Sequence, residues 1–500
     1  MMSTLRIISL IVISMVVMCI CDSNVHAQAL FSEPYAQIYH KILRFEIEDA
    51  SQELDGLNRK TGKQAAPHHL LENYIDCLYL FVTEDKDAYD KLKDAKKQRI
   101  KTLSAVRSDV MIEYTIADIE LQWAAVRFKF GDYFSAFTEV RRAYKSLSKI
   151  VDEYPDYYPA QMRLAILKIL IGTIPDAYQW GVKLIGMSGD VKGGFEKLDM
   201  AIARARNLND TFLAEVLAAK SMLVLQVLND EREAKKIIEH NFWNDLRGPL
   251  VTFLTISLYR KTGDNEKAIA YLEQMNLKHE GQQLPYLYFL AGDAYLKAMD
   301  ASAKNHLESY IKYHKGDQFI KSAYQRLAWY EAIYVSPYAY LKMIQKVTEN
   351  GSNLMDEDKS AQKEADRAVA PHRGLLRSRL LFDGGNYDEA KQQLDVILYE
   401  LQELSPIEII EYYYRLARVY DKKGETVLAL YNYNKVIEIG QANPAYFASN
   451  AALLSALIYE KKGDTVMADK MFNLCLKIKP EEYRTGIHQK AKSGLARLKG

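Results

Sequence analysis

A residue pattern near the C-terminus of this chain returns every 39 residues. Gly385, Gly424 and Gly463 mark its three copies. Each glycine is followed by an Ala five residues later, a large apolar residue nine later and a medium apolar residue twelve later: Ala390, Ala429 and Ala468; Leu394, Tyr433 and Phe472; Ile397, Val436 and Cys475. Fixed periods of roughly 20 to 50 residues are typical of stacked repeats, so we expect a helix-turn-helix unit in each copy.

The physics of such a unit explains why small residues recur. Glycine ends a first helix in a left-handed backbone conformation that other residues adopt only at a cost of about 1 kcal/mol or more. Asn386 and Asp464 then begin the second helix, and the alanines let the two helices pack closely. Comparable units surround Gly131 and Gly263, and a less regular one, centred on Gly292, runs through residues 286–313. We therefore predict an all-α fold, a right-handed superhelical solenoid.

The two best copies resemble the tetratricopeptide repeat. They read RLARVYDKKGETVLALYNYNKVIEIG and ALIYEKKGDTVMADKMFNLCLKIKP, with the small, Tyr, Gly, Ala and aromatic positions of that family and a closing Pro480. Their step of 39 residues exceeds the family norm of about 34, which implies longer helices or loops. The resemblance implies a protein that binds other proteins on the inner face of its curved array.

A glycine-rich segment at 171–201 interrupts the pattern. It lacks the lysine and hydroxyl residues of a phosphate-binding loop, so we expect tight turns between helices. It is also similar to a stretch of the eukaryotic inclusion-body-clearance family of tetratricopeptide proteins, through Pro175, Gly186, Gly189, Asp190, Gly194 and Leu198. That resemblance implies no catalytic role.

Residues 1–27 are typical of an export leader. Arg6 precedes an apolar run at 7–20, and Ala27 ends a short stretch that suits a signal peptidase. We expect a cleaved signal peptide and an exported bacterial protein, periplasmic or associated with the outer membrane, with no membrane span left after cleavage. The alternative is a lipoprotein anchored through Cys19 or Cys21, although neither follows the usual small residue.

The rest of the chain divides by pattern. We expect an irregular helical cap at 28–107, a repeat array at 108–348, a polar joint or long polar helix at 349–367, and a second array with a capping helix at 368–500. Within the cap, the basic run at 91–101 follows an acidic stretch, and we interpret it as a solvated helix face.

Composition and motifs exclude several functions. The chain carries 66 basic and 65 acidic side chains, a net charge of +1, which disfavours nucleic acid as a ligand. No zinc-protease, redox Cys or serine-hydrolase motif occurs, and His306 and His314 lie too far apart on one helix to share a metal. We expect no enzyme activity, metal or cofactor, and no disulfide between Cys77 and Cys475.

Binding residues should lie on the first helix of each hairpin, which lines the inner face of a solenoid. The register of the C-terminal glycines assigns this face to His372, Arg379, Tyr414, Arg418 and Asn450. The carboxylate-clamp version of the repeat uses Lys and Asn at such positions. Because Tyr414 and Arg418 depart from that pattern, the sequence does not predict a clamp for acidic peptide ends.

Three classes of function stay open on these grounds. We favour an exported, non-enzymatic scaffold that binds a protein or peptide partner in its groove at the cell envelope, in possible association with outer-membrane components. The second class is a glycan- or solute-capturing helical component of an outer-membrane uptake system, which usually exposes tryptophans; this chain has Trp123, Trp180, Trp243 and Trp329. The third is an α-helical hydrolase or lyase.

Overall fold

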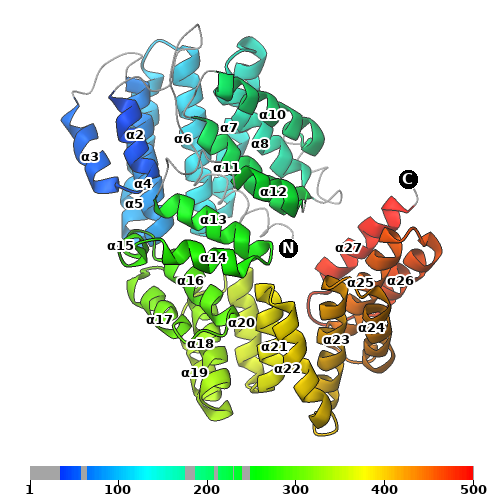
Figure 1. The fold of residues 1–500 in the computed structure, drawn as a ribbon. Helices are drawn as coiled ribbons and strands as arrows, with labels where there is room; N and C mark the ends of the chain where they lie inside the picture. Colours follow the sequence, from blue (N-terminus) through cyan, green and yellow to red (C-terminus); the bar gives the residue numbers. More distant parts are fainter. Residues whose placement is uncertain are drawn as a thin grey trace.

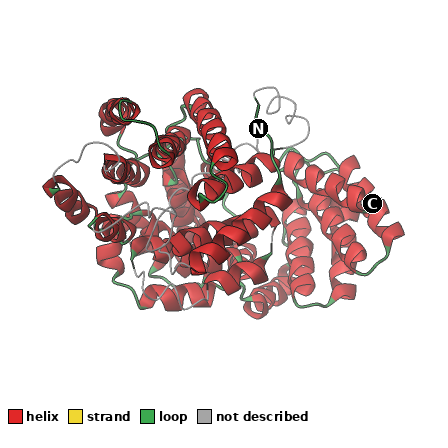
Figure 2. Cartoon of the chain, turned by 90° about the horizontal axis from the view of Figure 1, so that it is seen from above, coloured by secondary structure: helices red, strands yellow, loops and turns green. Residues whose placement is uncertain are grey.

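The computed structural model of the protein describes residues 34–57, 65–174, 186–207, 212–228, 230–238 and 248–498. Throughout these ranges the secondary structure is helical, with loops between the helices and no strand (Figure 2). The all-α solenoid prediction is confirmed. The expected signal peptide, its two cysteines, Pro175, Trp180 and Trp243 lie outside the described residues.

The N-terminal half is built from pairs of helices that pack side by side. Its elements are α2 (Tyr35–Leu43), α3 (Ile47–Gly56), α4 (Ala65–Thr83), α5 (Lys86–Ser104), α6 (Val110–Lys129), α7 (Tyr133–Glu153), α8 (Tyr158–Gly172), α10 (Val191–Asn207), α11 (Phe212–Leu223), η2 (Val224–Leu228) and α12 (Glu231–Ile238). Helix α6 packs on α7 and on α4, and α8 packs on α10. The described residues of the segment for which an irregular cap is predicted form α2 to α5, and α4 and α5 pack on α6.

The remaining chain continues as hairpins that curve in an arc (Figure 1). Its helices are α13 (Pro249–Lys261), α14 (Asn265–Glu273), α15 (Leu277–Gln283), α16 (Tyr286–Lys297), α17 (Ala303–Tyr313), α18 (Ile320–Tyr334), α19 (Pro337–Glu349), α20 (Asp356–Arg367), α21 (Arg373–Gly384), α22 (Tyr387–Ile397), η4 (Leu398–Glu400), α23 (Pro406–Lys422), α24 (Thr426–Gly440), α25 (Phe447–Lys461), α26 (Thr465–Lys477) and α27 (Arg484–Arg497). The α18–α19 hairpin was not recognised from the sequence, because its turn contains no glycine.

The turn glycines adopt the conformation expected of them. Their φ angles are +80° at Gly131, +75° at Gly263, +92° at Gly385, +78° at Gly424 and +78° at Gly463. At Gly385 there is a second constraint, since an added Cβ would overlap the carbonyl oxygen of Gly263 in the neighbouring turn. At Gly424 the same Cβ would meet nothing within 4 Å.

The polar segment 349–367 contains α20, which packs against α18 and α19. Asp358 on this helix is fully buried. Its carboxylate accepts hydrogen bonds from the backbone N–H groups of Phe319, at 2.6 Å, and Ser322, at 2.9 Å. Because those amides begin α18, where helix N–H groups have no partner of their own, α20 caps its neighbour from another part of the chain.

The N-terminal half folds back onto the middle of the chain. Glu84, just after α4, accepts hydrogen bonds from the backbone N–H groups of Asp317 and Gln318 at 3.0 and 3.2 Å. Its other carboxylate oxygen lies 3.0 Å from the Lys129 ammonium nitrogen at the end of α6. Contacts of this kind join residues more than two hundred positions apart, so the array is not a straight rod.

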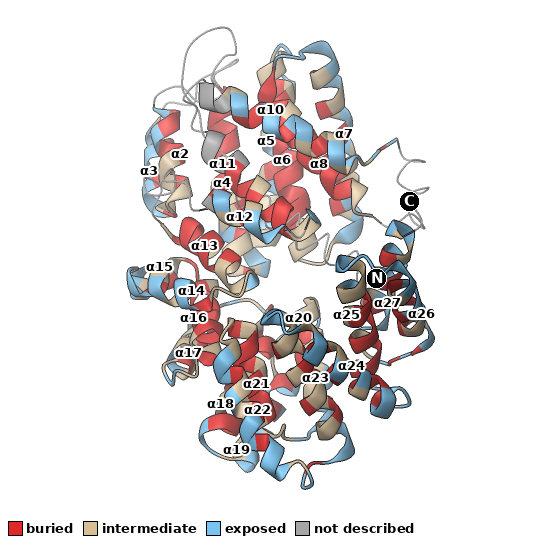
Figure 3. Cartoon of the chain, turned by 45° about the vertical axis from the view of Figure 1, so that its right-hand side comes forward, coloured by how far each residue is buried: buried red, intermediate tan, exposed pale blue. Residues whose placement is uncertain are grey.

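Buried side chains follow the faces on which the helices meet (Figure 3). One cluster of buried apolar residues extends from Tyr35 to Leu327, which joins the N-terminal half to the middle hairpins. The last hairpins have a core of their own, from Ile410 to Ala491. The stacking surfaces thus provide the hydrophobic stabilisation, and the sides of the first helices that face across the arc are left for other contacts.

Candidate partner groove and central cavity

The first helices of consecutive hairpins contact one another and form one wall, here called the inner wall. It comprises α13, α16, α18, α21, α23 and α25, each packed on the next in the series. Arg260, Arg326, Arg379 and Arg418 lie on four of these helices, and we call these four residues the arginine row. The arginine row takes one member from each of α13, α18, α21 and α23.

Aromatic rings order three members of the arginine row. The Arg326 guanidinium lies 5.4 Å from the centroid of the Trp329 ring, and that of Arg379 lies 4.7 Å from the same centroid. The Arg418 guanidinium lies 4.1 Å from the centroid of the Phe382 ring. Stacking of this kind stabilises a planar cation and reduces the entropy it loses when it binds a partner.

Two carboxylates contact the arginine row, and each contacts two of its arginines. Asp293 on α16 is almost fully buried and accepts from Arg260, from Lys297 at 2.8 Å and from Arg326 at 2.7 Å. Burial alone would raise the pKa of Asp293, but the cations around it hold that pKa well below its usual range. Asp383 on α21 lies between the other two arginines of the row, 3.9 and 3.8 Å from their nearest nitrogens.

The structure separates the residues expected on the inner face into three groups. Arg379 and Arg418 lie together around Asp383, with side chains 35% and 28% exposed. Tyr414 is buried, and its hydroxyl accepts a 2.6 Å hydrogen bond from the Asn450 side-chain amide, so these two residues mainly join α23 to α25. His372 precedes α21, where its Nδ1 atom accepts from the N–H of Leu375 at 3.4 Å.

Cavities of about 300 to 1,000 Å³ are typical of small-ligand sites, and the chain partly encloses one of about 570 Å³ at its centre. Its lining comes from α4, α6, α11, η2, α13, α16, α17, α20 and the loops beside them. Arg260 of the arginine row forms part of its wall, and Tyr483, from the loop before α27, forms part of its edge. No sequence pattern pointed to this cavity, because its residues are scattered from 45 to 483.

An ion-pair cluster forms one side of the cavity. Glu84 lies 3.0 Å from Lys129 and 3.7 Å from the imidazole of His314. Burial would raise the pKa of Glu84, but the charge of Lys129 and the contact with His314 outweigh burial and lower that pKa to about 2. The cluster is therefore internally compensated, and it fixes the junction between the two halves of the chain.

The expectation of a solvated face for the basic run at 91–101 is wrong at two positions. Lys96 is only 4% exposed and pairs with Glu139 on α7. Arg99 pairs with Asp76 on α4 at 2.5 Å. The physical reason is that α5 packs against α4 and α6, so one side of the helix is buried. The signal in the sequence is the helical spacing of Leu92, Lys96, Arg99 and Leu103.

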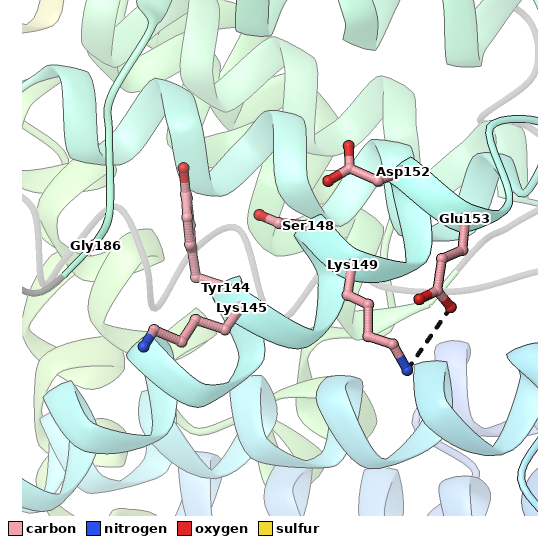
Figure 4. A pocket seen from close by; sticks show the side chains of 7 residues that line it. All are labelled: Tyr144, Lys145, Ser148, Lys149, Asp152, Glu153 and Gly186. Atoms are coloured by element: carbon pink, nitrogen blue, oxygen red, sulfur yellow. Dashed lines mark ion pairs between the residues drawn. The ribbon is translucent and has the colours of Figure 1, made fainter.

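A second, open hollow of about 400 Å³ lies beside α7 (Figure 4). Tyr144, Lys145 and Ser148 line it, and Lys149 points toward Glu153, 3.7 Å away. Lys149 also pairs with Glu113 on α6 at 3.2 Å. The hollow is open to solvent, and the ion pairs of Lys149 account for two of the charged side chains that line it, Lys149 itself and Glu153.

Other groups bear on the functions that were considered. Among the described residues no group of His, Cys, Asp and Glu side chains could hold a metal ion. Cys77 and Cys475 are both buried and unpaired. The described helices include none with the length and apolar character needed to cross a bilayer. Trp123 and Trp329 are buried, so neither offers an exposed ring to a sugar.

Comparison with known family models finds a repeat motif in two short stretches of the chain. A family model for the tetratricopeptide repeat matches residues 257–275 and 449–482, at the turn between α13 and α14 and at the α25–α26 hairpin. No curated protein sequence matches the chain.

Solved structures similar to this chain include the following three, each 14% identical to it. Yeast Tom70 has a TM-score of 0.25, with 83% of this chain and 97% of Tom70 covered. Cut9 of the APC/C hetero-tetramer Cut9–Hcn1 has a TM-score of 0.28, with 92% and 96% covered. A monomeric mutant of IFIT1 has a TM-score of 0.27, with 92% and 95% covered.

Proposed function

Since this chain carries tetratricopeptide repeats, a fold that generally mediates protein–protein interaction, we propose that it is a non-enzymatic scaffold exported to the bacterial cell envelope, where it binds a segment of a partner protein along its inner wall. The apolar N-terminal leader supports export. The periplasm or the inner side of the outer membrane is the compartment that such a leader would give it.

One observation carries the binding part of the proposal. Arg379 and Arg418 are part-exposed, are stacked on rings that hold them in place, and share the carboxylate of Asp383. Arginine is enriched among the residues that dominate interface energies, and a side chain ordered in advance loses less entropy on binding. The pair therefore suits contact with backbone carbonyl and acidic groups of a polypeptide.

The test is affinity capture from an envelope extract with immobilised leader-free protein. Arg379→Gln with Arg418→Gln removes both cations from the inner wall. The matched control is Lys435→Gln with Lys470→Gln, which removes a part-exposed cation from the second helix α24 and an exposed cation from the second helix α26. We expect the wild type and the control to retain the same protein. The inner-wall variant should retain at least about tenfold less of it, as expected when hot-spot residues that each contribute more than about 1 kcal/mol are removed.

Two results would contradict the proposal. Retention of oligosaccharide without any protein would point to the glycan-capturing alternative. Equal retention of the protein by the inner-wall variant and by the wild type would show that the partner binds elsewhere. Circular dichroism of both variants would verify that the helices are intact.

A further inference from the structure

The central cavity has properties that a groove for a polypeptide does not need. It is part-enclosed, it holds about 570 Å³, and its walls are mainly apolar. We propose that this cavity is a binding site for a small amphipathic anion, a molecule with an unbranched apolar body and one carboxylate, distinct from the partner surface at Arg379 and Arg418.

The apolar body is assigned to the rings and aliphatic side chains that converge on the cavity. These come from five separate parts of the chain: Phe81, Met222, Leu225, Phe253, Leu290 and Phe319. Cavities of this size with apolar walls and a few polar groups are typical of small-molecule sites. Each methylene that a ligand moves from water into such a cavity contributes about 0.8 kcal/mol.

The carboxylate is assigned to donors on α13 and α16. Ser257 and Arg260 are three residues apart on α13, so they lie on the same side of that helix, and both line the cavity. The Tyr286 ring lies against the same helix, 5.9 Å from Phe253. Burial raises the pKa of Tyr286 well above its usual range, which keeps the hydroxyl a hydrogen-bond donor. Within the described part of the chain, neither the Ser257 nor the Tyr286 hydroxyl has a hydrogen-bond partner.

Charge around Arg260 favours an anion. Arg260, Lys297 and Arg326 all contact the one buried carboxylate of Asp293, and the charges of Glu357 and Asp383 also act on Arg260 and Lys297. Uncompensated charge near a protein interior is unfavourable, and a ligand carboxylate would reduce it. Of these three cations, Arg260 is the one that lines the cavity.

The acidic residues that line the cavity do not prevent a carboxylate from binding at Arg260. Glu84 is neutralised by Lys129, as described above. Asp356 pairs with Lys359 at 3.3 Å. Glu357 lines the cavity and its charge acts on Arg260 and Tyr286, but the side chain is exposed, so water and salt weaken that effect.

The edge of the cavity favours a small molecule over a continuous polypeptide. Tyr483 hydrogen-bonds through its hydroxyl to the Ser360 side chain at 3.0 Å. Its ring also packs edge-on against Tyr446, with 5.2 Å between the centroids. The loop before α27 thereby ties the C-terminal array to α20 across one edge of the cavity, which leaves less room for a chain to pass through.

The test is isothermal titration of the leader-free protein with three probes that share a ten-carbon chain: decanoate, decanol and decyltrimethylammonium. We expect one decanoate per protein molecule and at least about tenfold weaker binding of the other two, because a hydrogen bond to a charged group contributes about 1.5–3 kcal/mol. Tyr286→Phe, which removes only a hydroxyl, should weaken decanoate severalfold, and Arg260→Met should weaken it by about tenfold or more.

Two further variants keep the test decisive if Arg260→Met fails to fold. Ser257→Phe fills the cavity from the surface of α13 and should abolish decanoate binding with the helices intact. Lys149→Met removes a cation at the hollow beside α7 and should change nothing. Any of four results would overturn the proposal: equal binding of the three probes, several bound molecules per chain, decanoate binding unaffected by Ser257→Phe, or no binding at all. Loss of the captured protein in the affinity experiment would bear only on the partner surface.

Discussion

Glu84→Gln tests how the two halves of the chain are held together. The pKa of Glu84 falls from its ordinary value of 4.5 to about 2 in the folded protein, which corresponds to roughly 3 kcal/mol of stabilisation. The side chain is only 7% exposed, so solvent screening reduces this little. Glutamine keeps the size of the side chain but leaves Lys129 and His314 without their carboxylate.

The amides of Asp317 and Gln318 report this junction directly, because both donate hydrogen bonds to Glu84. Hydrogen exchange read by mass spectrometry measures their local opening without assuming that a long array unfolds in one step. At pH 7 we expect exchange at these amides to be roughly a hundredfold faster in the variant, as 3 kcal/mol implies.

The dependence on pH has a definite sign. Because the folded pKa is depressed, the stabilisation is complete above the unfolded pKa of about 4.5 and is lost as pH falls toward 2. The difference between wild type and variant should therefore be constant from pH 7 to about 5.5 and then narrow. A difference that stays constant down to pH 3 would refute the reasoning.

Lys86→Gln is the matched control at the same junction. Lys86 pairs with Asp317 at 2.9 Å, but these side chains are 77% and 53% exposed. Exposed pairs contribute at most about 1 kcal/mol, so this variant should change exchange at the Asp317 and Gln318 amides by less than about fivefold. If both variants had the same effect, burial of Glu84 would not be the cause.

Three further predictions concern turns and buried charge. Gly385→Ala should destabilise the protein by about 2–5 kcal/mol, because of backbone strain and overlap with the neighbouring turn. Gly424→Ala, which meets no such overlap, should destabilise it by only about 1 kcal/mol. Equal losses of stability in urea unfolding would contradict this prediction. Burial raises the pKa of Asp358 to about 6, so the contribution of Asp358 to stability falls as pH rises from about 4 to 6. In thermal melts, the melting temperature of the wild type should exceed that of Asp358→Asn by less and less across this range. A difference that grows with pH would refute the prediction. Arg163→Met should lower the free energy of unfolding in urea by about 3–5 kcal/mol, because it leaves the fully buried carboxylate of Asp118, 2.6 Å away, without an opposite charge. Adding Asp118→Leu should recover part of that loss. No recovery would argue against the uncompensated charge as the cause.

Much of the local structure could be predicted from the sequence. Gly385, Gly424 and Gly463 end their helices in the left-handed region, and Ala390, Ala429 and Ala468 are fully buried at the contacts between helices. These features depend on the backbone preference of one residue and on the helical period, both of which act over a few positions. The sequence alone thus determined the hairpin unit and the repetition of that unit.

The candidate site could be predicted only in part. Arg379 and Arg418 were placed on the inner wall by register, and they do lie together there. Tyr414 and Asn450 share that register but bond to each other, because the neighbouring first helices approach closely enough to pair them. Register gives the side of a helix that a residue occupies, but it does not give the distance to the next helix.

What only the tertiary structure decided is the course of the array as a whole. Glu84 meets Asp317, and Phe81, Phe253 and Tyr483 come to one cavity, because small rotations between successive hairpins add up along the chain. Each rotation depends on the side chains packed between two units, and no single residue records the sum. The repeats can therefore be predicted from the sequence, whereas the cavity between them can be found only from the tertiary structure.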